Sequence, residues 1–470
     1  GAPAAVQVAS DEALGTGPIY FAPTSRSTLR AVGGPVVLTN ATTFAPAIGD
    51  SVVRLEGELT LAGPVSFAGS VGRPIAVAAG SAVTLAGSAG NGSFRLLADS
   101  FGGAAVSSGT LSIVSETQFD GRILVGAPAF GGSITPTAGA TLRVAHPKAL
   151  GHAGVQLDSP ASMLELDAPE GTTGMVVQAG NLFLQGSGVD GLGALYGHRG
   201  DNALNSDVHL LADAKVGVAM GHSLLLNGNW ADQSPASSSR LKKTGGGRLI
   251  IRQALITAID GPRPLAAIEV DAGTLQLGQN GADGWVGTLQ VVDGATLDLG
   301  ARRMFVDDGS VAEFDRLSSL IATARHGGAW DGAGITSSRI ALDPRAAIGL
   351  VRLSEVGGAN SVSSSFPLDD SALLLALVPA GDATMDGGVD LNDFTSLASS
   401  FGGPGNWARG DFDYDGLVGL NDFTALAANF GISGITSPIA KANAAAVPEP
   451  QLLLAWFCGL GLLLRTRRHH

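Results

Sequence analysis

The amino-acid sequence predicts a mainly β protein, in which a parallel β-helix or related solenoid precedes a small helical unit and a C-terminal hydrophobic helix. The composition supports this, because 68 Gly with only 5% aromatic and 15% charged residues suit thin stacked layers better than a thick globular core. A short strand phrase recurs from about Asp50 to Gly300. One acidic phrase, followed each time by a helix pattern, occurs twice within residues 381–432.

The predicted solenoid covers residues 1–300. Its recurring phrase is a Gly, a small residue and then alternating apolar and polar positions, as in GELTLAG, GTLSIV, GATLRV and GTLQLG. The period of two predicts strands with one buried face, and the Gly at each edge predicts a tight turn. Several phrases lie 21 to 30 residues apart, which is about one turn of a parallel β-solenoid.

Two segments resemble the autotransporter-associated β-strand repeat. Residues 109–157 contain its strand, Gly-rich turn, G-T-L-type strand and A-L-G, in the order GTLSIV, GG, GATLRV and ALG. Residues 241–278 resemble a second copy, with Lys243–Gly247 at the K-T-G-x-G turn, although Gln253–Pro264 lacks the usual aromatic and Thr-rich strand. The resemblance implies a right-handed parallel β-helix on the cell surface.

Residues 301–380 are predicted to cap the solenoid. An open end would expose unpaired strand edges and favour aggregation, so a cap is physically required. The segment Ser371–Ala380, SALLLALVPA, predicts a final strand. The segment Glu313–Arg325, EFDRLSSLIATAR, predicts a short helix whose apolar face consists of Phe314, Leu317, Leu320 and Ile321.

Residues 381–432 predict two calcium loops. The phrases GDATMDGGVDLNDFTSLASSFG and GDFDYDGLVGLNDFTALAANFG are offset by 29 residues, from Gly381 to Gly410. Carboxylates at alternating positions, a Gly turn and an apolar helix pattern indicate a 12-residue loop that wraps Ca²⁺ in oxygen ligands. Without the ion the packed carboxylates repel one another, so two-ion binding and local folding should be coupled. The predicted ligands are Asp382, Thr384, Asp386, Asp390, Asp393 and the Gly388 carbonyl in the first loop, and Asp411, Asp413, Asp415, Asp422 and the Leu417 carbonyl in the second.

The doubled loops resemble a type I dockerin domain. Asp ends each loop at position 12, and no helix pattern precedes either loop. Relative to that family, Thr384 and Gly419 each replace a carboxylate. The resemblance implies two calcium ions and a cohesin-like or other surface partner, contacted at positions 10 and 11, which are Leu391, Asn392, Leu420 and Asn421.

The two helices after the loops carry matching apolar stripes, which are predicted to pack on each other. An alternative is that the doubled unit docks on the solenoid cap as an intramolecular stabiliser; exposed stripes would argue against it. The stripes are Phe394, Leu397, Ala398 and Phe401 in the first helix, and Phe423, Leu426, Ala427 and Phe430 in the second.

The C-terminal residues resemble a PEP-CTERM sorting signal. A low-complexity linker, 433–446, leads to the signal, 447–470, which contains VPEP at Val447–Pro450, an apolar stretch at 452–464 and a basic end with Arg465. The resemblance implies export, transient contact of 452–464 with the inner membrane and processing by an exosortase. Thirteen apolar residues are short for a permanent span of about 20 residues.

Charge and motifs indicate a non-enzymatic surface protein. The net charge of −13 argues against nucleic acid as a partner, and G-x-S-x-G, H-E-x-x-H and G-x-x-x-x-G-K-[ST] are absent from the sequence. The predicted function is therefore structural or adhesive at the cell surface or in the extracellular matrix, with a polysaccharide or matrix component as a further partner. The alternative is a polysaccharide-degrading β-helix subunit carried by the dockerin-like unit, which would require a charged groove along the solenoid.

Overall fold

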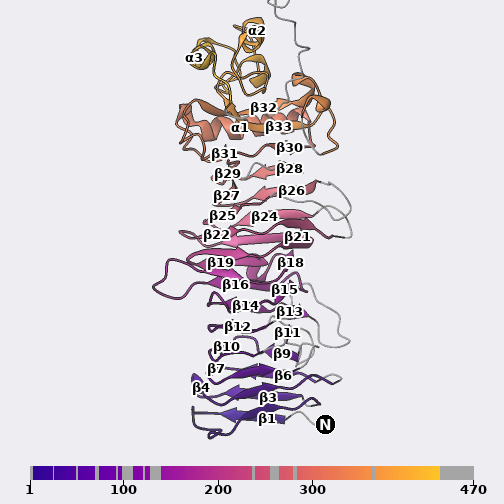
Figure 1. Ribbon diagram of the computed structural model, residues 1–470, viewed down its shortest axis with the longest axis vertical. Coiled ribbons are helices and arrows are strands. Elements are labelled where there is room, and N and C mark those ends of the chain that lie inside the picture. The colour runs from indigo at the N-terminus through magenta and orange to yellow at the C-terminus, as the bar shows by residue number, and fades with distance from the viewer. Residues whose placement is uncertain are drawn as a thin grey trace, which may run out of the picture.

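A computed structural model describes residues 4–434, except 25, 49–50, 69–72, 91–93, 98–108, 120–121, 128–138, 235–238, 254–263, 279–282 and 363–365. The described chain is mainly β. It forms a parallel β-solenoid of about ten turns, drawn out along one axis, with its few helices at the C-terminal end (Figure 1). The predicted parallel β-solenoid is confirmed.

Four ladders of parallel strands form the walls of the solenoid. The first contains β1 (Ala4–Val8), β3 (Ser27–Ala31), β6 (Val53–Glu56), β9 (Arg73–Val77), β11 (Phe94–Leu97), β13 (Arg122–Ala127), β15 (Gly154–Leu157), β18 (Leu182–Gly186), the start of β21 (Val208–Val218) and β23 (Trp230–Asp232). The second contains β4 (Val36–Leu38), β7 (Glu58–Leu61), β10 (Ala82–Leu85), β12 (Thr110–Ile113), β14 (Thr141–Val144), β16 (Met163–Asp167), β19 (Leu195–Arg199), the end of β21, β24 (Arg240–Thr244), β26 (Leu265–Val270), β28 (Gly284–Val291) and β30 (Met304–Val306).

The other two ladders are shorter. The third contains β17 (Val176–Gln178), β20 (Asp201–Asn205), β22 (Ser223–Leu226), β25 (Arg248–Ile251), β27 (Thr274–Leu277), β29 (Thr296–Asp298) and β31 (Gly334–Thr336). The fourth contains β2 (Ile19–Phe21), β5 (Thr42–Phe44) and β8 (Val65–Phe67). A short 3₁₀ turn, η1 (Val189–Gly191), lies between β18 and β19.

The recurring phrases stack on one another in register. Leu59 of β7 pairs with Val83, which pairs with Leu111, which pairs with Leu142. All four side chains are buried, so each turn of the solenoid covers the apolar face of the turn before it. In the ladders before the cap, paired residues lie between 20 positions apart, as Gly284 and Met304, and 32 apart, as Arg122 and Gly154. The last parallel pairing, Thr296 with Gly334, spans α1 and is 38 positions long. The sequence spacing therefore reported the length of one turn.

A column of aromatic rings adds to the aliphatic core at the N-terminal end. Phe21, Phe44 and Phe67 occupy equivalent places in β2, β5 and β8, and their ring centroids are 4.9 Å apart at both steps. Phe94 continues the column at 5.2 Å. Offset aromatic pairs of this kind contribute about 0.5–1.5 kcal/mol beyond their buried area.

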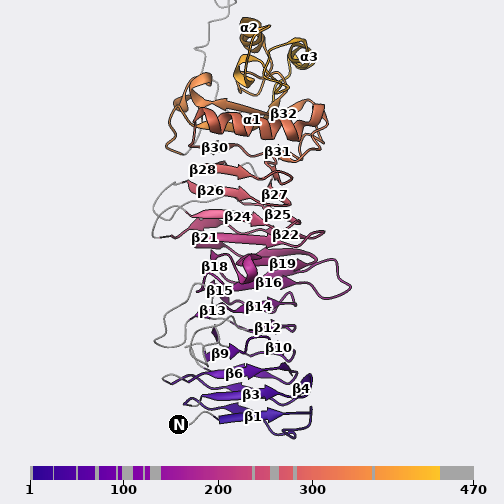
Figure 2. The ribbon, with the colours of Figure 1, turned by 180° about the vertical axis from the view of Figure 1, so that it is seen from behind.

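The C-terminal end of the solenoid is covered by α1 (Val311–Arg325), with η2 (His326–Gly328) after it, and by an antiparallel strand pair, β32 (Ala346–Arg352) and β33 (Leu373–Pro379). In both views α1 runs across the end of the stack (Figures 1 and 2). The predicted helix and final strand are both confirmed. β33 also pairs with β30 in the antiparallel direction, so the parallel ladder ends against a strand of opposite sense.

Ser310 is expected to stabilise α1 measurably. Its side chain accepts a hydrogen bond from the Glu313 backbone N–H at 3.2 Å, which satisfies a group that has no partner within the helix. Ser310→Ala is expected to lower the free energy of unfolding by about 1 kcal/mol. Ser319→Ala, on the exposed side of the same helix, is the control and should be neutral. Equal effects in chemical denaturation would contradict this role for Ser310.

Both faces of the β32–β33 pair are buried. On one face Ile348, Leu350 and Leu375 belong to the solenoid core. On the other, Val351 and Leu374 belong to a second core shared with the residues after Pro379. This second region contains α2 (Leu391–Ser400), η5 (Trp407–Arg409) and α3 (Leu420–Asn429), while η3 (Leu353–Val356) and η4 (Ala359–Ser361) lie between β32 and β33. The strand pair is therefore a common wall between two cores.

The predicted linker and sorting signal continue beyond the described residues. Of the linker, only Ser433 and Gly434 are described, and 435–470 with the apolar stretch 452–464 lie outside. Within the described part of the chain, none of the helices combines the length and the apolar character that crossing a membrane requires.

Candidate metal centre

The two acidic loops, 382–393 and 411–422, have the same local fold. Met385 and Tyr414 occupy position 4 of each loop with φ of 60° and 62°, and Gly387 and Gly416 occupy position 6 with φ of 86° and 87°. Left-handed backbone at these positions turns each loop sharply, and Gly meets that demand without steric cost. Each loop leads directly into a helix, α2 or α3.

The two copies also exchange contacts across a local pseudo-twofold axis. Gly388 forms an antiparallel bridge with Ser433, and its counterpart Leu417 forms one with Pro404. A Cβ on Gly381 would lie 2.8 Å from Leu426 Cα, and one on Gly410 would lie 2.7 Å from Leu397 Cα. Each loop therefore begins tightly against the helix that follows the other loop, so the two sites fold as one unit.

In the first loop, two buried carboxylates organise the backbone. Asp382 accepts hydrogen bonds from the N–H groups of Asp386 at 3.1 Å and Gly387 at 2.8 Å. Asp393 accepts from Thr384 N–H at 3.0 Å and Asp390 N–H at 2.8 Å. The carboxylates at positions 1 and 12 thus hold the loop in its conformation by hydrogen bonds to its own backbone.

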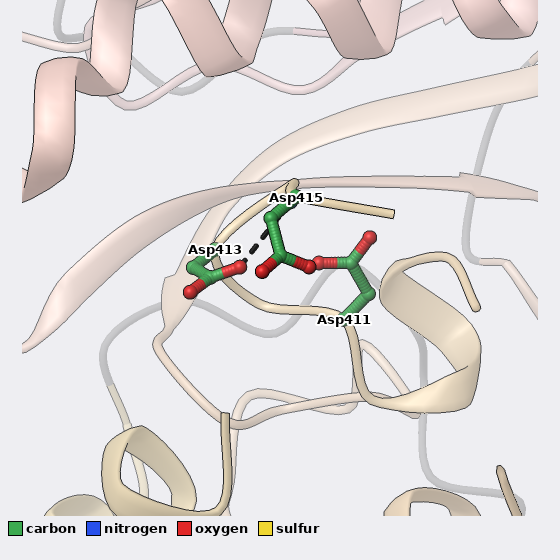
Figure 3. A group of neighbouring side chains, drawn as sticks. All are labelled: Asp411, Asp413 and Asp415. Atoms are coloured by element: carbon green, nitrogen blue, oxygen red, sulfur yellow. Dashed lines mark hydrogen bonds between the residues drawn. The ribbon is translucent and has the colours of Figure 1, made fainter. Parts of the chain in front are cut away.

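The second loop repeats this arrangement. Asp411 Oδ2 accepts from Gly416 N–H at 3.0 Å. Asp422 accepts from Phe412 N–H at 2.7 Å and Gly419 N–H at 2.8 Å. Asp411, Asp413 and Asp415 turn toward one another (Figure 3), and each offers a carboxylate oxygen within 4.8 Å of the other two.

The other predicted ligands lie in the same loops with roles of their own. Thr384 Oγ donates to Asp382 at 3.4 Å, and Asp386 accepts from Gly388 N–H at 3.0 Å. Asp390 accepts from Asn392 N–H at 2.7 Å at the start of α2. Among the described residues, a mutually close trio of acidic groups occurs only in the second loop. Thr384, which replaces a carboxylate at position 3, accounts for the difference.

Burial makes these carboxylates hard to keep charged. Burial, with the nearby Asp393 charge, raises the pKa of Asp382 to about 8, and burial raises that of Asp411 to about 6. The pKa values of Asp393 and Asp422 are also raised, mainly by burial. Asp411 Oδ1 is buried and has no hydrogen-bond partner among the described residues. A divalent cation would compensate both the burial and this unpaired oxygen, so the donor set fits Ca²⁺.

The loops are attached to the wall by side chains that sequence reasoning missed. Trp407 is fully buried, and its Nε1–H donates to the Asp382 carbonyl at 2.7 Å. Tyr414 donates its hydroxyl hydrogen to the Ile348 carbonyl at 2.7 Å. A Cβ on Gly349 would lie 2.6 Å from Met385 Sδ, so β32 approaches the loop closely there. One sequence signal could have revealed this attachment. Position 4 of both loops holds a large side chain, Met385 or Tyr414, which calcium binding by the loop does not require.

The predicted packing of the two helix stripes is only partly correct. Leu397 and Leu426 are buried, but in the second core and against Gly410 and Gly381. Ala398 and Ala427 are exposed. The rings of Phe394 and Phe423 meet edge to face at 6.5 Å and stay 38% and 39% exposed. The physical reason is that each buried leucine faces the start of the other copy's loop, Leu397 at Gly410 and Leu426 at Gly381.

Exposed apolar side chains remain on the module. Six of them form three equivalent pairs, 29 residues apart, at the loop ends and along the helices. These residues, called the paired apolar surface below, are Leu391 and Leu420, Phe394 and Phe423, and Phe401 and Phe430. The unit thus docks on the cap and also keeps exposed stripes, a combination that neither sequence alternative described.

A charged cluster on the second ladder was also missed by sequence reasoning. Glu165 and Asp167 of β16 lie on neighbouring strands with Arg143, His198 and Arg199. Arg143 bonds Glu165 at 3.0 Å, and Arg199 bonds Asp167 at 3.0 Å. These residues lie on three different strands and meet only because of the register between successive turns. No sequence motif could therefore predict the cluster. Their mutual pairing is typical of a structural ion network.

Comparison with known proteins was made at the level of families, curated sequences and structures. No family model, no curated protein and no solved structure matches this chain. The class that the structure itself defines is a mainly β protein with a parallel β-solenoid and few helices. The dockerin-like, repeat and sorting-signal resemblances stay predictions from the residues that carry them.

Proposed function

We propose that this protein is a non-enzymatic, exported structural or adhesive protein of the cell surface or extracellular matrix, and that its doubled loops bind two calcium ions. The observation that supports this best is the second loop, where Asp411, Asp413 and Asp415 converge and Asp411 Oδ1 has no hydrogen-bond partner in the described chain. The first loop repeats the fastening of positions 1 and 12 with Asp382 and Asp393.

In this proposal calcium acts structurally. Asp382, Thr384, Asp386, Asp390, Asp393 and the Gly388 carbonyl would hold one ion, and Asp411, Asp413, Asp415, Asp422 and the Leu417 carbonyl the other. Each ion supplies positive charge to carboxylates that burial disfavours in their ionised form. Because the loops share a core with β32 and β33, calcium would stabilise the end of the solenoid as well as the loops.

The module is also proposed to join this protein to a cohesin-like or other surface partner. The paired apolar surface supports this, since its six large apolar side chains are exposed, two of them meet at Phe394 and Phe423, and exposed apolar patches often mark protein interaction sites. Export, exosortase processing and transient membrane contact of 452–464 belong to the same proposal and rest on the VPEP, apolar and basic order of the C-terminal residues.

The partner surface is expected to work in two equivalent orientations. Leu391→Asp or Leu420→Asp alone should leave capture of a partner from the producing organism's surface fraction nearly intact, because the other copy offers the same contacts. The double variant should abolish capture, as should chelation of calcium. Immobilised full-length protein and mass spectrometry provide the measurement. Capture that survives both the double variant and the chelator would contradict the proposed assembly role.

An enzymatic role as a polysaccharide-degrading subunit is the less favoured alternative. Such chemistry needs carboxylates that are free to exchange protons or attack a substrate. The clustered carboxylates of β16, Glu165 and Asp167, are instead engaged by Arg143 and Arg199. This pairing supports the structural proposal.

A further inference from the structure

A groove of about 460 Å³ lies where the third ladder meets the cap. Its floor is the outer face of the last strands of that ladder, and its walls are the segment after α1 and the turns after β31. Its lining includes Arg248, Thr274, Thr296, Asp298, Trp330 and Asp331.

The floor presents short polar side chains in register. Thr274 of β27 pairs with Thr296 of β29, and Thr296 pairs with Gly334 of β31. The next outward position brings Asp298 beside Thr336. Gly334 adds no side chain, and a Cβ there would lie 2.1 Å from the Leu320 carbonyl of α1. Thr274 and Thr296 therefore place two partly exposed hydroxyl side chains on successive turns, about 4.8 Å apart, and α1 covers the next position at Gly334.

One wall holds an aromatic ring in an unusual backbone conformation. Trp330 has φ of 56°, a region that bulky residues rarely occupy. It lies beyond Gly327 and Gly328, which also have positive φ, and beside a 2.6 Å contact between His326 and Asp331. Backbone in this region persists where the surrounding structure over-determines it. Trp330 is half-buried and packs against both cores, so its position is rigid.

Asp298 is a fixed acceptor at the centre of the floor. Its Oδ1 accepts from Gly300 N–H at 2.9 Å and Ser338 N–H at 2.8 Å. Among the described residues these bonds reach Oδ1 alone, which leaves Oδ2 to accept from a ligand. The Thr336 hydroxyl oxygen also has no hydrogen-bond partner in the described chain, but it is buried beneath the floor and is not offered to a ligand.

We propose that this groove binds a neutral oligosaccharide without cleaving it. A sugar ring has apolar C–H faces and a rim of hydroxyl groups, which match a rigid Trp ring beside a row of Thr and Ser hydroxyls and one carboxylate. A polyanionic chain fits less well, because Asp298 and Asp331 oppose the single cation Arg248. The proposal goes beyond the proposed function and does not depend on calcium.

The test is isothermal titration calorimetry of the full chain with neutral glucan, mannan and xylan hexasaccharides and with hexagalacturonate. At least one neutral probe should bind, and Trp330→Ala should weaken it by about tenfold or more, while Trp330→Phe keeps most of the affinity. Asp298→Asn should also weaken binding, whereas Asp293→Asn, on an exposed turn outside the groove, should not.

Thr296→Tyr is a second test, needed because a Trp330 variant could lose binding by losing its fold. The new Tyr side chain fills the groove without removing a core contact. It should abolish binding with an unchanged melting temperature. Binding of hexagalacturonate alone, no binding of any neutral probe, or neutral binding that survives Thr296→Tyr would each overturn the proposal.

Discussion

Calcium is expected to stabilise the full-length chain strongly, and each ion should act through its own loop. At a free concentration one hundred times the dissociation constant, one site contributes about 2.7 kcal/mol, so two sites contribute about twice that. Calorimetric titration should show two binding events. Asp382→Ala should remove the first-loop event and Asp411→Ala the second, while Asp293→Ala on the solenoid should keep both.

The effect of Asp411→Asn on stability should change sign between chelator and calcium. This reversal distinguishes metal binding from a purely structural role of these carboxylates. Burial raises the pKa of Asp411 to about 6, so the folded state at pH 7 holds a charge that its surroundings disfavour. In chelator, Asp411→Asn should therefore be neutral or stabilising, and the new amide oxygen can still accept from Gly416 N–H. In calcium the same change should destabilise. Absence of binding heat, or the same sign in both conditions, would contradict the calcium proposal.

Trp407→Ala is expected to be the most damaging single change in the module. Trp407 is fully buried, lies 5.1 Å from the Phe412 ring and 5.6 Å from the Tyr414 ring, and donates to the Asp382 carbonyl. Truncation of a buried Trp typically costs about 3–5 kcal/mol. Chemical unfolding followed by circular dichroism provides the measurement.

Two further variants sharpen the Trp407 result. Phe430→Ala removes an equally apolar ring that is 55% exposed, and it should change stability by less than about 0.5 kcal/mol. Gly349→Ala removes nothing but places a Cβ 2.6 Å from Met385 Sδ and 2.9 Å from Trp407 Nε1, so it should destabilise by crowding. If Trp407→Ala and Gly349→Ala both behave like Phe430→Ala, the loops and the wall do not share a core.

Most of the fold could be predicted because each turn of the solenoid has its signal within a short stretch of sequence. Phrases such as GTLSIV carry both the alternation that makes a strand and the Gly that makes a turn, and their spacing gives the length of a turn. The apolar periodicity of 313–325 gave α1, and the apolar run at 371–380 gave β33. These signals need no knowledge of distant contacts.

The unpredicted features depend on which distant segments meet. The antiparallel pairing of β33 with β30 and β32 leaves no trace in any one strand's pattern, because a fully apolar strand does not reveal its neighbours. The same holds for the packing of Leu397 against Gly410 and of Leu426 against Gly381, and for the groove beside Trp330. In the candidate site, the ligand spacing was local and visible, whereas the attachment of Trp407 and Tyr414 to the cap was not.

The way the chain leaves the module determines how it would carry mechanical load. The segment after α3 pairs with the first loop, since Val389 N–H donates to the Ile432 carbonyl at 3.0 Å and Gly431 N–H donates to the Val389 carbonyl at 2.8 Å. A pull on residues beyond Gly434 would therefore act first on these hydrogen bonds and peel this segment from the first acidic loop before β33 left its sheet. The resistance of the C-terminal end of the described chain would then be set by that loop, and the long stack of turns behind it would stay folded until the loop gave way.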